Sequence, residues 1–158
     1  MSYRDLVNKL IESNITISTM ESCTGGGVSN AITNIEGASE ILRFSAVTYS
    51  NEYKIKMGVK KETIDEYSVY SIEVAKEMSK QISDFAGSNY GIGITGKLNR
   101  QDESNTRGKT NEVHVCIYDK DNAVYNTYSL EVVDQTRHEN KELILNKIIV
   151  YLKEILYN

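Results

Sequence analysis

The stretch ITISTMESCTGGGVSNAI, residues 15–32, contains the pattern from which the fold of this chain can be worked out. It opens with ITIST, whose β-branched residues predict a strand. The polar, glycine-rich segment ESCTGGG comes next. Apolar residues from Val28 to Ile35 then recur at helical spacing, and Gly37 is placed to end that helix. A strand that turns through glycines directly into a helix is typical of α/β proteins.

The rest of the chain alternates between helical and strand patterns. Before and after the opening stretch, these patterns predict a helix over 3–13, a strand over 43–50 and a short helix or turn that ends at Gly58. A turn from Thr63 then leads into a long helix, which Ser71 caps and which runs to Phe85. The remaining elements are a strand over 90–95, a mobile polar loop over 96–110, a hairpin of 112–118 and 123–130, and a closing helix containing Leu143 to Ile155. We therefore expect one α/β domain over 1–158. It has three layers, a mixed and mostly parallel sheet with helices on both faces, a C-terminal hairpin and a closing helix.

Size and charge limit the classes of partner. A chain of 158 residues suits one domain, and its net charge of -4 argues against a dedicated nucleic-acid binder, which needs a concentrated basic face. No apolar run approaches the roughly 20 residues that span a bilayer, and the N-terminus lacks the apolar stretch of a signal peptide. We expect a cytoplasmic protein that binds neither membrane nor nucleic acid.

Cysteine and histidine spacing indicates no metal site. Cys23 and Cys116 lie far apart and form no CxxC pair, so neither a zinc site nor a disulfide is predicted. His114 falls in an alternating strand and His138 in a polar helix start, where each is expected to be structural or solvated. We predict no metal ion and no organic cofactor.

The segment ESCTGGG can be interpreted in two ways. A strand delivers the hydroxyls of Ser22 and Thr24 to a turn whose glycines, Gly25 and Gly26 among them, would let a ligand approach N–H groups at a helix N-terminus, forming an anion or oxyanion pocket. Alternatively, it is only a tight strand-to-helix turn with Ser22 or Thr24 as the N-cap. No lysine follows the glycines, so the segment is not a Walker loop.

The segment TYSNEYK places Tyr49 at a strand end and Lys54 shortly after it. A lysine that loses its proton in a desolvated pocket can act as the base for a serine hydroxyl, and a tyrosine can relay or donate the proton. The alternative is a solvated Lys54 among Lys56, Lys60 and Lys61, with Tyr49 packed at the strand end.

These segments occur in an order that resembles a known family. ESCTGGG is followed by GAS at 37–39, by VTYSNEYK at 47–54 with GV at 58–59, and by ITG at 94–96. The chain resembles the CinA C-terminal family across nearly its whole length. That family includes amidases that hydrolyse nicotinamide mononucleotide to nicotinate mononucleotide and ammonia.

The resemblance implies roles for individual residues. Ser22 would be the nucleophile, Lys54 its base and Tyr49 an assisting hydroxyl. The substrate, a pyridine nucleotide, would be held at the matched positions Thr24, Gly25, Gly26, Ser39, Thr95 and Arg137, and Arg137 would suit its phosphate. Family members commonly self-associate, so a homo-oligomer is expected as well.

The chain departs from the family's pattern after Thr95. Members read TGIAGP followed by glycines, whereas this chain reads TGKLNRQDESNTRGKTNEV, and a second basic residue expected one turn after Arg137 appears as Lys141. A charged and more mobile loop at 97–109, in place of a glycine and proline loop that would bring rigid backbone donors to the ligand, can reshape or obstruct the pocket. Three hypotheses follow: an amidase acting on nicotinamide mononucleotide, a non-catalytic domain that binds a nucleotide or a partner, or an amidase with another substrate. Cys23 is an alternative nucleophile, although a packed thiol is the commoner role.

Overall fold

A computed structural model describes all residues, 1–158, and its elements alternate as the sequence predicts. They follow in the order α1 (Tyr3–Glu12), β1 (Ile17–Glu21), α2 (Gly27–Thr33), the 3₁₀ helix η1 (Ala38–Glu40), β2 (Leu42–Val47), α3 (Asn51–Lys56), α4 (Lys61–Tyr67), α5 (Ile72–Ala86), β3 (Tyr90–Gly96), β4 (Glu112–Asp119), β5 (Val124–Glu131) and α6 (Arg137–Tyr157). No helix combines the length and apolar character needed to cross a membrane.

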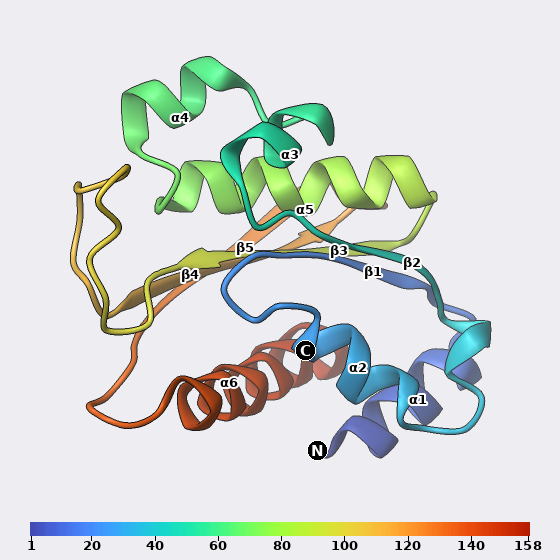
Figure 1. Cartoon of the computed structure of the whole chain (residues 1–158). Helices are drawn as coiled ribbons and strands as arrows, with labels where there is room; N and C mark the ends of the chain where they lie inside the picture. Colours follow the sequence, from blue (N-terminus) through green and yellow to red (C-terminus); the bar gives the residue numbers. More distant parts are fainter.

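The five strands form one sheet in the order β2-β1-β3-β4-β5. β1 pairs in parallel with both β2 and β3, whereas β4 is antiparallel to both of its neighbours. Helices α3, α4 and α5 cover one face, and α1, α2 and α6 cover the other (Figure 1). The predicted three-layer α/β fold, with its mixed sheet, terminal hairpin and closing helix, is confirmed. Parallel and antiparallel pairings are equal in number, so the sheet is mixed rather than mostly parallel.

Each face of the sheet has its own apolar core. The larger core joins α1, α2 and α6 to alternate residues of β3 and β4, such as Ile92, Ile94 and Val115. The smaller core lies under α5 and contains Met20, Met78 and Ile82. Side chains that alternate across the sheet therefore bury both faces, as a central α/β sheet requires.

Two glycines in YGIGIT bring α5 close to β3. A Cβ on Gly93 would lie 2.3 Å from the Ala75 carbonyl oxygen, and one on Gly91 would lie 2.0 Å from that of Ser79. Both contacts are with the backbone of α5, which cannot swing aside as a side chain can. The alternating glycines thus set the separation between this helix and the sheet.

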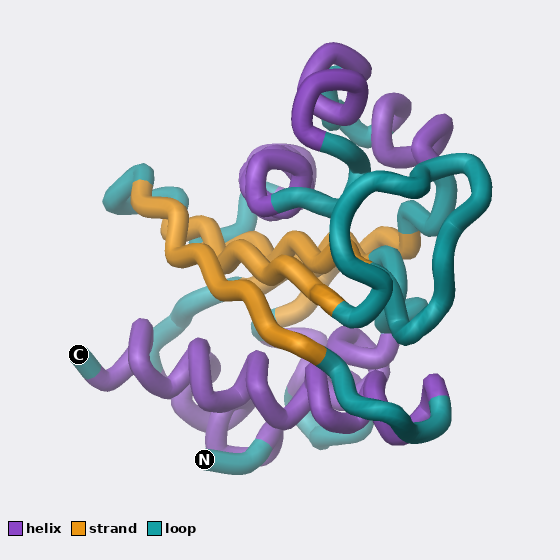
Figure 2. The backbone as a smooth tube through the Cα atoms, turned by 90° about the vertical axis from the view of Figure 1, so that its left-hand side faces the viewer, coloured by secondary structure: helices purple, strands orange, loops and turns teal.

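Three local predictions need correction. α2 ends at Thr33, with Asn34 as its C-cap, and Gly37, at φ 88°, instead begins η1. The region after Thr63 is not only a turn, because residues 61–67 form the separate helix α4. Only Ile64 of α4 is buried, so the sequence carries no apolar periodicity that would reveal it. In addition, Asp102 and Asn105 form an isolated bridge within the predicted polar loop, whose chain path is visible beside the strand ends in Figure 2.

Replacing Gly93 with alanine tests the close approach of α5. We expect Gly93→Ala to lower the free energy of unfolding by about 3 kcal/mol or more, because backbone atoms must shift. Gly87→Ala is the control: it has open space around it but a φ of 67°, so a loss of only about 1 kcal/mol is expected. Chemical denaturation measures both, and equal losses would contradict this account of the packing.

Candidate functional site

The site lies where the carboxyl ends of β1 and β2 meet, because Glu21 pairs with Val47 at the end of both strands. From there the chain leaves β1 for α2 on one face and leaves β2 for α3 on the other (Figure 1). Connections that diverge in this way leave a crevice at the strand ends, where α/β proteins bind their ligands. Ser22 directly follows β1, and Lys54 lies on α3 after β2.

Lys54 and Ser22 are in direct contact at this crevice. The Lys54 Nζ lies 3.0 Å from the Ser22 Oγ and 2.6 Å from the Thr48 carbonyl oxygen. Lys54 is 2% exposed, and it belongs to none of the molecule's ion pairs. The alternative of a solvated surface lysine is therefore wrong, since α3 turns this side chain inward while Lys56 stays outside in an ion pair with Glu52.

Burial gives this amine the character of a base. Loss of hydration lowers the pKa of Lys54 from 10.5 to about 8, and no carboxylate offsets the effect. An unprotonated amine has two N–H donors and one lone pair. The Thr48 carbonyl oxygen accepts one N–H, which leaves the lone pair available to accept the Ser22 hydroxyl proton.

Glu21 holds the glycine turn, and sequence reasoning did not single it out. Its fully buried carboxylate accepts hydrogen bonds from the Thr24 hydroxyl at 2.7 Å and from the Val28 and Ser29 N–H groups at 2.9 and 3.0 Å. A carboxylate at this helix N-terminus satisfies donors that would otherwise be unpaired. The start of α2 is thus already occupied, which corrects the prediction of a free anion pocket there.

The turn itself offers different donors from those predicted. Gly25 and Gly27 donate their N–H groups to the Ser22 and Thr24 carbonyl oxygens, and Gly26, at φ 90°, is the N-cap of α2 with no side-chain cap bond. The Cys23 and Thr24 N–H groups donate no hydrogen bond within the chain. The N–H of the residue after a serine nucleophile is a common oxyanion donor, and Cys23 occupies that position.

The Cys23 thiol is not suited to nucleophilic attack. It is buried in the larger core, and that burial raises the pKa of the thiol from 9.0 to about 12. The thiolate is the reactive form, so at neutral pH this side chain packs rather than reacts.

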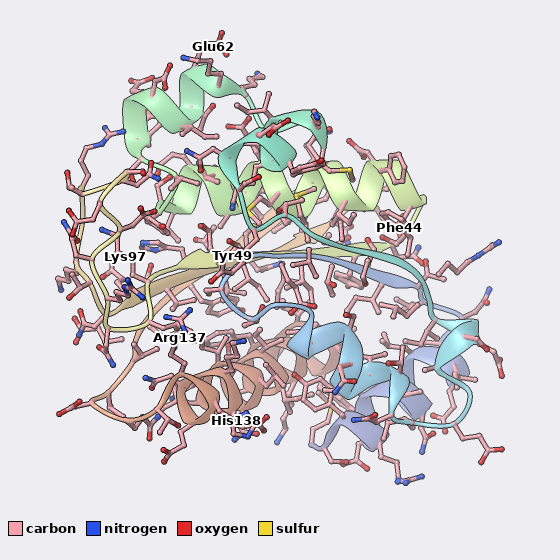
Figure 3. All side chains as sticks on the ribbon, in the orientation of Figure 1. Phe44, Tyr49, Glu62, Lys97, Arg137 and His138 are labelled. Atoms are coloured by element: carbon pink, nitrogen blue, oxygen red, sulfur yellow. The ribbon has the colours of Figure 1, made fainter.

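Two adjoining cavities open beside the Ser22 hydroxyl. Their volumes are about 350 and 290 Å³, and both are lined by Ser22, Tyr49, Tyr70 and Asp102. Lys54 lines the smaller cavity and Arg137 the larger. The Arg137 guanidinium lies 3.4 Å from the Tyr49 hydroxyl, and both side chains gather at the same end of the sheet as Lys97 (Figure 3).

Not every predicted residue reaches these cavities. Thr24 and Thr95 turn their hydroxyls away, to Glu21 and to the Val69 carbonyl oxygen respectively. Gly25 and Gly26 are not among the lining residues. Gly25 instead lies under the Lys141 side chain, whose Nζ would be 3.4 Å from an added Cβ.

Ser39 lies at the other end of the sheet. It is exposed on η1, just before β2 begins, and Leu42 of β2 pairs with Ile17 at the start of β1. The predicted catalytic residues Ser22, Lys54 and Tyr49 are therefore brought together with Arg137, whereas Ser39 is not.

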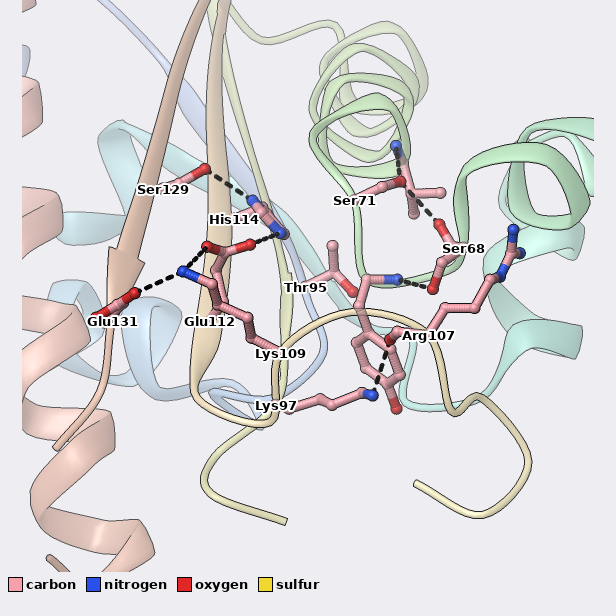
Figure 4. A network of polar contacts seen from close by, with 12 residues as sticks. Ser68, Ser71, Thr95, Lys97, Arg107, Lys109, Glu112, His114, Ser129 and Glu131 are labelled. Atoms are coloured by element: carbon pink, nitrogen blue, oxygen red, sulfur yellow. Dashed lines mark hydrogen bonds and ion pairs between the residues drawn. The ribbon is translucent and has the colours of Figure 1, made fainter. Parts of the chain in front are cut away.

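The polar loop after β3 forms much of the cavity wall. Lys97, only 3% exposed, donates to the Arg107 carbonyl oxygen at 2.9 Å (Figure 4). The Arg107 guanidinium in turn donates to the carbonyl oxygens of residues 64–66 at the end of α4. The loop also contributes Arg100, Gln101, Asp102 and Glu103 to the larger cavity. Sequence reasoning located the loop but not these residues, since no spacing links them to Ser22.

Neither histidine belongs to the site. His114 in β4 is buried, with Nδ1 2.8 Å from the Ser129 hydroxyl and Nε2 3.1 Å from Glu112, and burial lowers its pKa (Figure 4). His138 lies on the exposed side of α6 (Figure 3). No group of three His, Cys, Asp or Glu side chains is arranged to hold a metal ion.

Comparison with known proteins agrees with this architecture. The family model described as the CinA C-terminal domain matches residues 2–156. The chain belongs to the CinA C-terminal domain family. The predicted resemblance is thereby confirmed over nearly the whole chain.

Solved members of the CinA superfamily share the fold. A competence-damaged protein (CinA) superfamily protein from Escherichia coli superposes with a TM-score of 0.87 at 23% identity, covering 97% of this chain and 87% of that one. A competence damage-inducible protein A from Klebsiella pneumoniae gives 0.88 at 22% identity, covering 100% and 99%.

Sequence relatives include longer proteins that carry the name competence-damage inducible protein. One from Clostridium acetobutylicum is 51% identical over 88 residues, which are 55% of this chain and 21% of the relative. Another, from Clostridium perfringens, is 46% identical over 98 residues, 61% and 24% respectively. The matched part of this CinA domain thus spans a quarter or less of those relatives.

The buried amine makes the stability of this CinA domain depend on pH. In the unfolded chain Lys54 titrates near 10.5 and in the folded chain near 8, so between these values the unfolded state binds more protons and stability rises with pH. Against Lys54→Met, the parent should gain roughly 3 kcal/mol of unfolding free energy from pH 8 to 10.5. Urea denaturation across this range measures the difference, with Lys56→Met as the exposed control. Parallel curves for parent and Lys54→Met would show that the amine is not desolvated.

Proposed function

We propose that this domain hydrolyses the carboxamide of a pyridine nucleotide, converting nicotinamide mononucleotide to nicotinate mononucleotide and ammonia. The 3.0 Å contact between the Lys54 Nζ and the Ser22 Oγ, inside a cavity-lined crevice, is the observation that carries the proposal. Membership of the CinA C-terminal family supports the same reaction class.

The chemistry needs only groups of this chain and water. Ser22 Oγ attacks the amide carbon while its proton passes to Lys54, and the Cys23 N–H stabilises the oxyanion. The tetrahedral intermediate collapses as Lys54 returns the proton to the leaving nitrogen, which departs as ammonia. Water, deprotonated by Lys54, then cleaves the resulting ester to give the acid and free Ser22.

The cavity has suitable groups for the rest of such a substrate. Arg137 and Arg100 both line the larger cavity, and neither forms an ion pair within the chain. A guanidinium binds a phosphate through two parallel hydrogen bonds. The Tyr49 hydroxyl, near Arg137, is placed to contact the substrate at the mouth of both cavities.

Substitution of the two central residues tests the assignment. Ser22→Ala and Lys54→Met should each lower kcat for ammonia release from nicotinamide mononucleotide by a factor of about 10³ or more, because nucleophile and base act as a unit. Lys56→Met, on the same helix but solvated, should keep the parent rate. Equal rates in parent, Ser22→Ala and Lys54→Met would exclude the mechanism.

The pH dependence gives an independent check. With a pKa of about 8, Lys54 is unprotonated in roughly one tenth of the molecules at pH 7. We therefore expect kcat/KM to rise nearly tenfold per pH unit below this pKa and to level off above it. Steady-state rates from pH 6 to 9.5 measure the profile, and a rate that is flat below pH 8 would argue against Lys54 as the base.

The loop at 97–109 supports a second candidate, a domain that binds the nucleotide without turnover. This charged, hydrogen-bonded segment builds much of the cavity wall where the family has a glycine and proline loop. Calorimetry separates the candidates, since binding of nicotinamide mononucleotide without ammonia release favours the second. Self-association and a cytoplasmic location remain predictions alongside both.

A further inference from the structure

The loop at 97–109 contributes one acidic residue, Asp102, to both cavities of the crevice. Asp102 lines both cavities, as Ser22 does, so it faces the same space as the proposed nucleophile. Glu103, the other loop acid at the site, lines only the larger cavity. Asp102 belongs to none of the family motifs, because it lies in the segment 97–109, where the sequence of this chain differs from the family pattern.

The Asp102 carboxylate is fixed by neutral groups alone. It accepts hydrogen bonds from the Tyr70 hydroxyl, from the Ser104 N–H at 3.0 Å and from the Asn105 amide at 3.1 Å. Asn105 is itself 3.4 Å from the Asn51 amide, which ties the loop to the start of α3. These bonds orient the carboxylate and, with the Tyr70 bond foremost, hold the pKa of Asp102 below its usual value.

No cation of the chain neutralises this charge by contact. Asp102 takes part in none of the ion pairs. The charge of Lys97 helps to lower the pKa of Asp102, but the two groups form no ion pair: the Lys97 ammonium donates to the Gln101 and Arg107 oxygens and lies over the Tyr70 ring, 4.9 Å from its centroid. An oriented carboxylate that lines a cavity and has no cation in contact favours a ligand that supplies one.

Positive and negative side chains are therefore distributed differently over the two cavities. Arg100 and Arg137, which form no ion pair, line only the larger cavity, whereas Asp102 lines both cavities, as Ser22 does. A ligand with an anionic group at one end and a cationic centre near its reacting amide would complement both. We propose that Asp102 is a specificity residue, which selects an amide substrate whose ring carries a positive charge, an N-glycosylated pyridinium.

This inference rests on the proposed function for the identity of the ring, but its test uses binding and needs no turnover. The probes are nicotinamide mononucleotide and its reduced 1,4-dihydro form, which share the phosphate, ribose and carboxamide but differ in ring charge. Calorimetry in a Ser22→Ala background gives the ratio of the two dissociation constants. We expect the oxidised, cationic form to bind more tightly.

Asp102→Asn removes the charge and keeps the shape. It should weaken binding of the cationic form by about tenfold, the effect of one charge pair a few ångströms apart in a partly solvated cleft, and leave the neutral form within about twofold. Asp134→Asn is the matched control, because Asp134 is exposed and lines neither cavity. It should leave the ratio unchanged.

Tyr70→Phe tests whether the preference depends on the charge of Asp102 or on the position in which the Tyr70 hydrogen bond holds the loop. It removes the hydrogen bond but keeps the carboxylate, so preference for the cationic ring should persist. The inference is overturned if Asp102→Asn affects both nucleotides equally or neither, if Tyr70→Phe abolishes the preference as fully as Asp102→Asn, or if the parent binds neither nucleotide. If binding prefers the cationic form and depends on Asp102, but the parent with Ser22 intact releases no ammonia, the amidase proposal is contradicted and this inference stands.

Discussion

The contact between the buried Lys54 amine and the Ser22 hydroxyl is the interaction on which the rest of the site depends. An amine in water is protonated at neutral pH and cannot accept a proton from serine. Here α3 carries Lys54 beneath the end of β2, where loss of hydration brings the pKa to about 8. Because the Thr48 carbonyl oxygen takes one N–H, the amine is held in position without a carboxylate that would restore its affinity for the proton.

The surrounding fold supplies the constraint that keeps this pair together. β1 and β2 are neighbours in the sheet, and their following segments leave on opposite faces, so a serine after one strand meets a lysine after the other. The buried Glu21 carboxylate fixes the turn that bears Ser22 by capping α2. Glu21 therefore has a structural role, and the Cys23 N–H next to the proposed nucleophile donates no hydrogen bond within the chain.

The loop after β3 lines the crevice that contains the Lys54 and Ser22 pair. Arg107 joins the loop to α4 by hydrogen bonding to a carbonyl oxygen of that helix. Asp102 joins it to the segment before α5 by accepting a hydrogen bond from the Tyr70 hydroxyl. The loop does not fill the crevice, since cavities of about 350 and 290 Å³ remain beside Ser22. It sets the charges that a ligand meets there, and these charges would govern the choice of substrate in the proposed reaction.

The sequence by itself determined the order of the elements other than α4, the three-layer α/β class and the segments that carry Ser22, Tyr49 and Lys54. These follow from local signals: β-branched runs, apolar residues at helical spacing, and glycines at a turn. Only the tertiary structure decided whether Lys54 was solvated or buried, because a lysine's exposure depends on which face its helix presents to the sheet. It also decided that Thr24 and Thr95 bond to the protein itself, that Ser39 lies at the opposite end of the strands, and that Tyr70 and Asp102 join the site. Those contacts link residues far apart in the chain, and no local pattern encodes the distance between them.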